Sequence, residues 1–225
     1  MDILRKINKI KQTALLKSII FNFHYLPFQQ AIHLPILLGR RTYLAHMGGS
    51  IVLEGPIKRG IIHIGYRRIG FQDKKYDRTK WHVSGKVIFH GNGIVIGMGT
   101  DISVAGTLEI ERNVCITGAS TIICLNHISL GKKALISWDV LLMDTDFHPI
   151  EDLENGKILN PDKPITIGDD VWIGCRASIL KGSVIPNGCV VAASSVISRK
   201  LEKENCVYRG DGYIIREGIK WHHFI

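Results

Sequence analysis

One feature of this sequence restricts its possible folds more than any other: an aliphatic residue recurs at every sixth position. The longest run is unbroken and reads Ile167, Ile173, Ile179, Ile185, Val191 and Ile197. Residues of small or medium size follow four positions later, namely Val171, Ala177, Ser183, Cys189 and Ser195. A period of six fits neither an α-helix nor a half-buried strand. It indicates short strands joined by tight turns, each pointing one aliphatic side chain inward.

Two shorter runs with the same period stand earlier in the chain. One passes through Ile110, Ile116, Ile122 and Ile128, slips by two residues, and continues through Leu130, Ile136 and Leu142. The other reads Ile96, Ile102 and Leu108. Three short strands make a triangular coil, and stacked coils bury a continuous aliphatic column with strands roughly 4.8 Å apart. The sequence therefore predicts an all-β solenoid, a parallel β-helix of hexapeptide repeats.

The longest break in the repeat lies between Leu142 and Ile167. This polar segment contains three prolines, so we predict an excursion loop over residues 143–165. The core of a solenoid offers no reactive groups. Function is therefore expected where the repeat fails.

His148 is the candidate catalytic residue of this loop, because an imidazole can accept a proton near neutral pH. Asp146 and Asp144 precede it by two and four residues, and in an extended chain such residues face the same way. A carboxylate, or alternatively a backbone carbonyl, would then fix the tautomer of the ring. On the residues alone, a solvated loop histidine is the competing interpretation.

The N-terminal stretch lacks the six-residue period. Its apolar residues follow a spacing of three and four, which predicts an amphipathic helix: Leu4, Ile7, Ile10, Ala14, Leu15 and Ile19. Two roles stay open for this helix, packing against the first coils or a sister subunit, and lying at the inner membrane surface. We divide the chain into an N-terminal helical region (1–45), a β-helix domain (46–200) and a C-terminal tail (201–225).

The net charge of +9 is concentrated near the N-terminus. Residues 1–80 hold fifteen Lys and Arg against four Asp and Glu, whereas residues 81–225 hold fourteen against sixteen. A solvated basic face, a membrane-surface contact and an anionic acceptor are the open interpretations. No nucleic-acid recognition motif accompanies the charge, so nucleic acid is not an expected partner.

Cysteine usage and hydropathy bear on location. The five cysteines are scattered and form no CxxC pair, which favours a reducing compartment. We read no signal peptide and no run of apolar residues long enough for a membrane span. The expected location is the cytoplasm, with peripheral contact at the inner membrane as a further expectation.

The stretch "ITIGDDVWIGCRASILKGSVIPNGCVVAASSVISRK" resembles the terminal coils of hexapeptide-repeat acyltransferases of the galactoside and maltose O-acetyltransferase type. The resemblance is strongest to the branch that acts in capsule and lipopolysaccharide synthesis, and it covers about residues 85–220. It implies a left-handed β-helix and a homotrimer with active sites between neighbouring subunits. It also implies O-acetyl transfer from acetyl-CoA to a saccharide acceptor.

The resemblance implies roles for individual residues as well. His148, followed by Pro149, matches the family's general base, and we assign Asp146 beside it as the residue that orients its ring. Trp172 matches a wall of the acceptor cleft, and we place Asp144 with it in the substrate-binding set. Carried over by position, the acetyl-CoA-binding residues are Cys175, Ala193, Ser198, Arg199 and Arg216.

The chain departs from the family in "YRGDGYIIREG" (residues 208–218). The usual Gly-x-Pro-Ala turn followed by Lys or Arg is absent, and Arg209 or Arg216 would have to substitute. Three alternative functions stay open. They are N-acetyl transfer to an amino sugar, a metal enzyme of the γ-carbonic-anhydrase kind, and a non-enzymatic scaffold. His127 and His148 are too far apart in the sequence to be a compact ligand pair, and the adjacent His222 and His223 lie near the C-terminus, so we predict no metal site.

Overall fold

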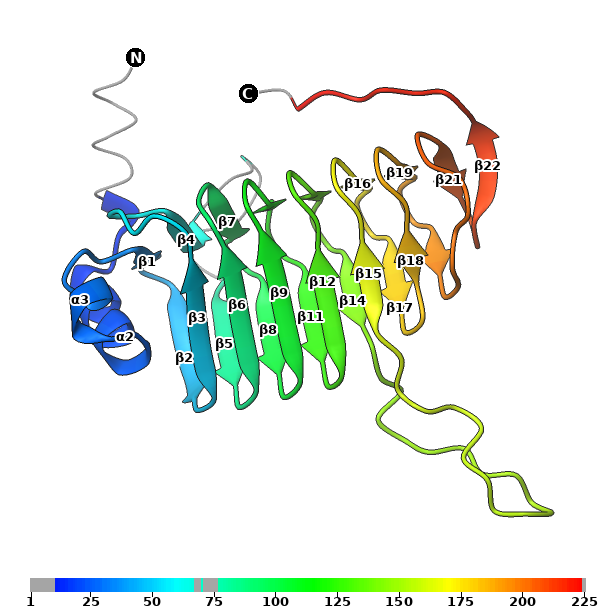
Figure 1. The fold of residues 1–225 in the computed structure, drawn as a ribbon, viewed down its shortest axis with the longest axis horizontal. Coiled ribbons are helices and arrows are strands. Elements are labelled where there is room, and N and C mark those ends of the chain that lie inside the picture. Colours follow the sequence, from blue (N-terminus) through cyan, green and yellow to red (C-terminus); the bar gives the residue numbers. More distant parts are fainter. Residues whose placement is uncertain (1–10, 67–69, 71–76, 224–225) are drawn as a thin grey trace.

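The protein is a three-sided prism built from short strands that wind around one long axis (Figure 1). The structure is a computed structural model that describes residues 11–66, 70 and 77–223. The chain visits the three sides in a fixed order, so strands three apart in sequence are neighbours in one sheet. We call the sides sheet 1, sheet 2 and sheet 3, in the order in which the chain enters them.

Each sheet runs the length of the prism, and all of its strand pairs are parallel except β21 with β22. Sheet 1 contains β1 (Ile36–Leu38), β4 (Ile62–Tyr66), β7 (Ile94–Gly97), β10 (Cys115–Ile116), β13 (Leu135–Ile136), β16 (Trp172–Ile173), β19 (Val190–Val191), β21 (Val207–Arg209) and β22 (Tyr213–Arg216). Sheet 2 contains β2 (Thr42–Met47), β5 (Thr79–Val83), β8 (Asp101–Val104), β11 (Thr121–Cys124), β14 (Leu141–Met143), β17 (Ser178–Leu180) and β20 (Val196–Ile197). Sheet 3 contains β3 (Ser50–Glu54), β6 (Lys86–His90), β9 (Thr107–Glu111), β12 (His127–Leu130), β15 (Ile165–Ile167) and β18 (Val184–Ile185).

The residues of the six-residue runs form the core, as predicted. Every member of the longest run, from Ile167 to Ile197, is at most 1% exposed. The small residues four positions later, such as Ala177 and Ser183, are buried at the corners of the prism. The predicted parallel β-helix of hexapeptide repeats is therefore confirmed.

The coils are not all of one length. In the C-terminal part, Trp172 pairs with Val190, eighteen residues further on. In the middle of the chain Cys115 pairs with Leu135, twenty residues further on. The extra residues lie in longer strands of sheets 2 and 3, such as β9 with five residues against β18 with two. This explains why the early six-residue runs slip whereas the last one does not.

The corners of the C-terminal coils turn through left-handed backbone conformations. Positive φ angles recur six residues apart at Asp170, Arg176, Gly182, Gly188 and Ser194. Gly174 is needed for a different reason, because a Cβ there would lie 2.6 Å from the backbone nitrogen of Ala193 on the next coil. Glycine therefore serves coil stacking as well as turn conformation.

Among the described residues, α2 (Leu15–Tyr25) and α3 (Phe28–Ala31) cover the N-terminal end of the prism. Phe21 of α2 packs edge-on against the buried Trp81, with ring centroids 5.2 Å apart. The expected amphipathic helix is thus described in its second half, while Leu4, Ile7 and Ile10 lie outside the described residues. Strands β1 and β2 begin within the region expected to be helical, and β21 continues sheet 1 beyond residue 200.

Within residues 11–66, 70 and 77–223, no helix has both the length and the apolar character that crossing a bilayer requires.

Candidate active site

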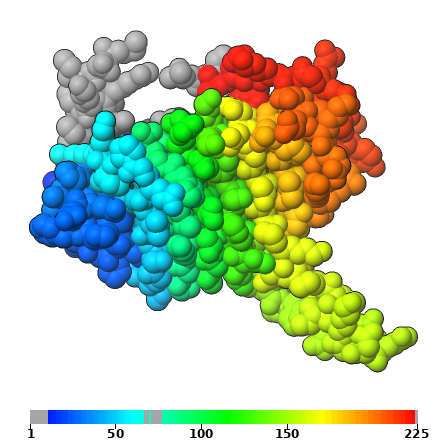
Figure 2. Space-filling view, in the orientation of Figure 1, coloured from blue at the N-terminus to red at the C-terminus, as the bar shows by residue number. Residues whose placement is uncertain are grey.

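The excursion loop leaves the prism at the edge between sheets 2 and 3, where it joins β14 to β15. It spans residues 144–164 and forms an arm that stands clear of the prism (Figures 1 and 2). On the next coil the same edge is crossed by residues 181–183 alone, between β17 and β18. The arm therefore replaces one ordinary corner of the prism.

Asp144 anchors the base of the arm. Its side chain is fully buried, and its carboxylate accepts hydrogen bonds from the backbone N–H of Leu125 at 2.7 Å and of Asn126 at 2.9 Å. The pKa of the neighbouring Cys124 thiol is raised, first by burial and then by the charge of Asp144. We expected Asp144 to bind substrate, and in the structure its carboxylate faces two backbone amides of the preceding corner. A buried carboxylate that already satisfies two backbone amides holds the arm to the preceding corner.

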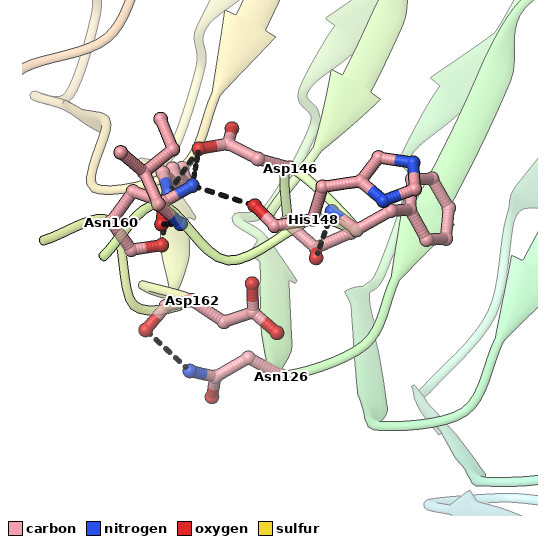
Figure 3. Close-up of polar contacts among 9 residues, drawn as sticks. Asn126, Asp146, His148, Asn160 and Asp162 are labelled. Atoms are coloured by element: carbon pink, nitrogen blue, oxygen red, sulfur yellow. Dashed lines mark hydrogen bonds and ion pairs between the residues drawn. The ribbon is translucent and has the colours of Figure 1, made fainter. Parts of the chain in front are cut away.

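The carboxylate of Asp146 faces the neighbouring corner. Its Oδ2 accepts hydrogen bonds from Lys181 Nζ at 2.5 Å and from Asn160 Nδ2 at 2.8 Å. The hydrogen bond from the Lys181 ammonium, and then the one from Asn160, lower the pKa of Asp146. The structure does not bring this carboxylate to the ring of His148, which we expected it to orient (Figure 3). Within one chain, Asp146 instead ties the arm to the adjacent coil.

The backbone of His148 is fixed by hydrogen bonds, whereas its side chain is exposed. Its N–H donates to the carbonyl of Asp146 at 2.7 Å, and its own carbonyl accepts from Asn160 Nδ2 at 3.0 Å. The residue is exposed, and Figure 3 shows the imidazole pointing away from Asp146 and Asn160. Phe147, the preceding residue, has a φ of +61°, a conformation rare for a large side chain. A strained turn thus projects the imidazole outward from a fixed backbone.

A small cavity accompanies His148 at the base of the arm. Its volume is about 240 Å³, and the two limbs of the arm form its walls, with Pro149, Ile158 and Pro161 among the lining residues. Lys181 Nζ also donates to the carbonyl of Asn160 at 2.6 Å, so one ammonium binds both limbs. These contacts hold the cavity open beside the imidazole.

Trp172 lies on a different side of the prism. It belongs to β16 in sheet 1, is 38% exposed, and its indole N–H donates to Ser137 Oγ at 3.0 Å. The C-terminal tail returns along this side (Figure 1), and the ring of Trp221 lies 5.9 Å from that of Trp172. A groove of about 600 Å³ runs between tail and sheet and is lined by both tryptophans and Lys133.

The expected acetyl-CoA residues fall on two edges. Cys175 and Ala193 lie on stacked corners between sheets 1 and 2, where the N–H of Ser194 donates to the carbonyl of Cys175 at 2.9 Å. Ser198 and Arg199 are exposed and follow β20, on the edge between sheets 2 and 3 that also carries the arm.

Arg216 is exposed on β22. The described part of one chain therefore does not bring all the expected site residues together, because sheet 2 separates the two edges.

Three residues that matter to this geometry were not singled out from the sequence. Lys181 and Asn160 hold the arm, yet each bonds to partners many residues away, so no local pattern marks them. The tail residue Trp221 was missed for the same reason. Its indole N–H donates to the carbonyl of Asp170 at 2.5 Å, fifty-one residues earlier.

In residues 11–66, 70 and 77–223, no group of three or more His, Cys, Asp or Glu side chains is arranged to hold a metal ion.

Comparison with known proteins agrees with this architecture. The family described as bacterial transferase hexapeptide (six repeats) matches residues 164–199, which contain the unbroken six-residue run. A polysialic acid O-acetyltransferase of Neisseria meningitidis is 33% identical over 110 residues, which cover 44% of this chain and 51% of that protein. This chain is similar to bacterial hexapeptide-repeat acetyltransferases over part of its length. The resemblance found in the sequence is therefore confirmed.

Another relative matches a larger share of this chain. An uncharacterised 24.8 kDa protein in the cps region of Klebsiella pneumoniae is 34% identical over 153 residues, covering 65% of this chain and 63% of that protein. The hexapeptide-repeat chain thus spans less than two thirds of the length of these curated relatives.

The crystal structure of the polySia specific acetyltransferase NeuO has a TM-score of 0.55 at 22% identity, covering 81% of this chain and 83% of that one. At that identity the likeness bears on the fold alone, and it confirms the expected left-handed β-helix.

Proposed function

We propose that this chain is an acetyltransferase that moves the acetyl group of acetyl-CoA to a hydroxyl of a saccharide, in the synthesis of a bacterial surface polysaccharide. The observation that carries the proposal is the exposed imidazole of His148, presented on a backbone that Asp146 and Asn160 hold. The relation to a polysialic acid O-acetyltransferase supports the class of donor and acceptor.

The chemistry assigned to His148 is general-base catalysis. The imidazole takes the proton of the acceptor hydroxyl while the hydroxyl oxygen attacks the thioester carbonyl carbon. Backbone amides near the arm stabilise the oxyanion of the tetrahedral intermediate. The carbon–sulfur bond then breaks, and the imidazolium returns its proton to the departing thiolate. The products are an acetyl ester and free coenzyme A, and no acyl-enzyme forms.

The C-terminal coils fit the donor. The corner residues Ala193 and Ser194 and the nearby Ser198 are small and exposed, so the backbone between coils is open to a thin pantetheine arm. Arg199, whose guanidinium lies beside Gly212, and the exposed Arg216 offer positive charge for the nucleotide phosphates. These residues would hold acetyl-CoA along the coils.

A homotrimer would complete this site. In one chain His148 and Trp172 lie on different sides of the prism, so a second subunit has to supply the missing wall. The arm supports such a contact, because it carries exposed large apolar residues that a neighbour would cover. They are Phe147, Ile150, Leu153, Ile158 and Leu159.

The proposed location is the cytoplasm, where acetyl-CoA is made and where all five cysteines, none of them paired in the structure, would stay reduced. Peripheral contact with the inner membrane remains a separate prediction from the basic N-terminal region.

The experiment that tests the function is release of free thiol from acetyl-CoA with a panel of saccharide acceptors. We expect acceptor-dependent release and a product whose acetyl group is removed by hydroxylamine, as an ester requires. A product that resists hydroxylamine would indicate N-acetyl transfer to an amino sugar. Activity that rises with the amount of metal bound to the purified protein would favour the alternative of a metal enzyme of the γ-carbonic-anhydrase kind. If the chain neither releases thiol nor binds immobilised coenzyme A, the non-enzymatic scaffold is the remaining function.

A further inference from the structure

Helix α2 presents an apolar stripe to solvent. Its members recur at helical spacing on one face and are each at least 36% exposed: Leu15, Leu16, Ile19, Ile20 and Phe23. Phe28 and Ile32 continue the stripe, and the rings of Phe23 and Phe28 lie 6.0 Å apart. A contiguous exposed apolar patch of this kind on a folded protein marks a surface that contacts another protein, a ligand or a membrane.

The packing of α2 fixes this orientation. Ser18 and Asn22 lie on the buried face of the helix, against β1, the edge strand of sheet 1. Asn22 bonds both the N–H and the carbonyl of Ile36, at 3.1 Å and 2.7 Å, and Ser18 Oγ accepts from the N–H of Leu38 at 2.9 Å. Turning the helix to bury its stripe would leave these buried groups without partners. The exposure of the stripe is therefore part of the fold.

The N-terminal part of the prism, to which the stripe belongs, is basic. Six Lys and Arg residues occur between residues 11 and 66, namely Lys11, Lys17, Arg40, Arg41, Lys58 and Arg59, against the single acidic residue Glu54. Glu54 is paired with His90. In the part of the chain that the structure describes, no ion pair joins any of the six to a carboxylate. Lys17 flanks the stripe, with its ammonium 3.0 Å from the carbonyl of Thr42.

We propose that the stripe and these basic side chains form a docking surface for an anionic lipid bilayer, with α2 lying in the plane of the headgroups. Apolar side chains would enter the acyl boundary while Lys and Arg stay at the level of the phosphates. A two-fold contact with a second copy is disfavoured, because it would bring the same basic side chains together. The surface lies at the opposite end of the prism from β22 (Figures 1 and 2), and the arm projects elsewhere.

The test is co-sedimentation of the full chain with vesicles, which needs neither acetyl-CoA nor acceptor and is therefore independent of the proposed function. We expect binding to vesicles that contain phosphatidylglycerol, little binding to phosphatidylcholine alone, and a loss of binding as salt rises. Ile20→Asp should weaken the partition into vesicles about tenfold or more, because a charge replaces an apolar side chain that would enter the acyl boundary of the bilayer. Ile215→Asp is the matched control, since Ile20 and Ile215 are each 52% exposed.

Four outcomes would overturn the proposal. They are absence of wild-type binding, equal binding to both vesicle types, equal loss in the two variants, and a stripe variant that changes only the oligomeric state in solution. Leu16→Asp provides a second stripe variant, at a site 71% exposed, and must behave as Ile20→Asp does. Unchanged thermal unfolding of all three variants establishes that binding, and not folding, is compared.

Discussion

Two neighbouring corners on one edge of the prism have very different lengths. The chain crosses from sheet 2 to sheet 3 through residues 181–183 on one coil and through the arm, residues 144–164, on the coil before it. The strands on either side are undisturbed, since Leu142 pairs with Ile179 and Ile167 pairs with Ile185 in register. The β-helix therefore tolerates this long insertion at its edge, because closure of a longer loop adds little free energy.

The comparison distinguishes residues that stabilise the fold from residues that are proposed to take part in the reaction. The short corner contributes buried Ser183 and the anchoring Lys181, whereas the arm contributes an exposed imidazole and a cavity. Substitutions of exposed side chains on the arm should therefore change turnover without changing stability, and substitutions of the buried aliphatic column should do the reverse.

The largest expected effect is on the arm. We expect His148→Ala to lower the turnover of acetyl-CoA by about 10²–10⁴, because the acceptor proton loses its base. Thermal unfolding and coenzyme A binding should stay as in the wild type, since the side chain of His148 is exposed. His33→Ala, which removes another exposed histidine, is the control and should retain turnover. Near-native turnover of the His148 variant would remove this residue from the mechanism.

The opposite effect is expected in the core. Ile173 is fully buried on β16, and Ile173→Ala should lower the free energy of unfolding by about 2–5 kcal/mol through lost apolar contact and a residual cavity. Val196→Ala, at a 48% exposed position on β20, should lower it by less than about 1 kcal/mol. Denaturant unfolding of both variants measures the difference. Equal losses would mean that the aliphatic column does not dominate stability.

The sequence predicted the prism and the position of the arm, but not the contacts that anchor the arm, for a physical reason. Core residues such as Ile167 and Ile173 reveal themselves because each coil must repeat the same inward side chain. The partners of Asp144 and Asp146 depend instead on which corners become neighbours after folding. No periodicity encodes the bonds from Leu125 to Asp144 and from Lys181 to Asp146, so the anchoring contacts of these two carboxylates could not be predicted.

A substitution at the junction between arm and prism should have an effect of intermediate size on stability. In Asp144→Asn, one of the two backbone amides, of Leu125 or Asn126, loses its acceptor, and the free energy of unfolding should fall by about 1–3 kcal/mol. Asp139→Asn is the control, because Asp139 is exposed and its left-handed backbone also suits asparagine. If the two variants unfold alike while the Michaelis constant for the acceptor rises only in the first, Asp144 contacts substrate after all.

The smallest effect is expected where the short corner touches the arm. Lys181→Met removes the ammonium that binds Asp146 and Asn160 but keeps the apolar stem, so the pKa of Asp146 should rise toward its ordinary value. Carbon-detected NMR titration of the carboxylate measures that change. Turnover should fall by roughly two- to tenfold as His148 loses its fixed position.

The pH dependence has a definite sign. Because folding lowers the pKa of Asp146, its stabilising contribution is present above the unfolded value of about 3.9 and is lost as the pH falls through the folded value. Wild type and Lys181→Met should therefore differ in melting temperature near neutral pH and converge in strong acid. A difference that persists in acid would mean that Lys181 acts through the carbonyl of Asn160 and not through Asp146.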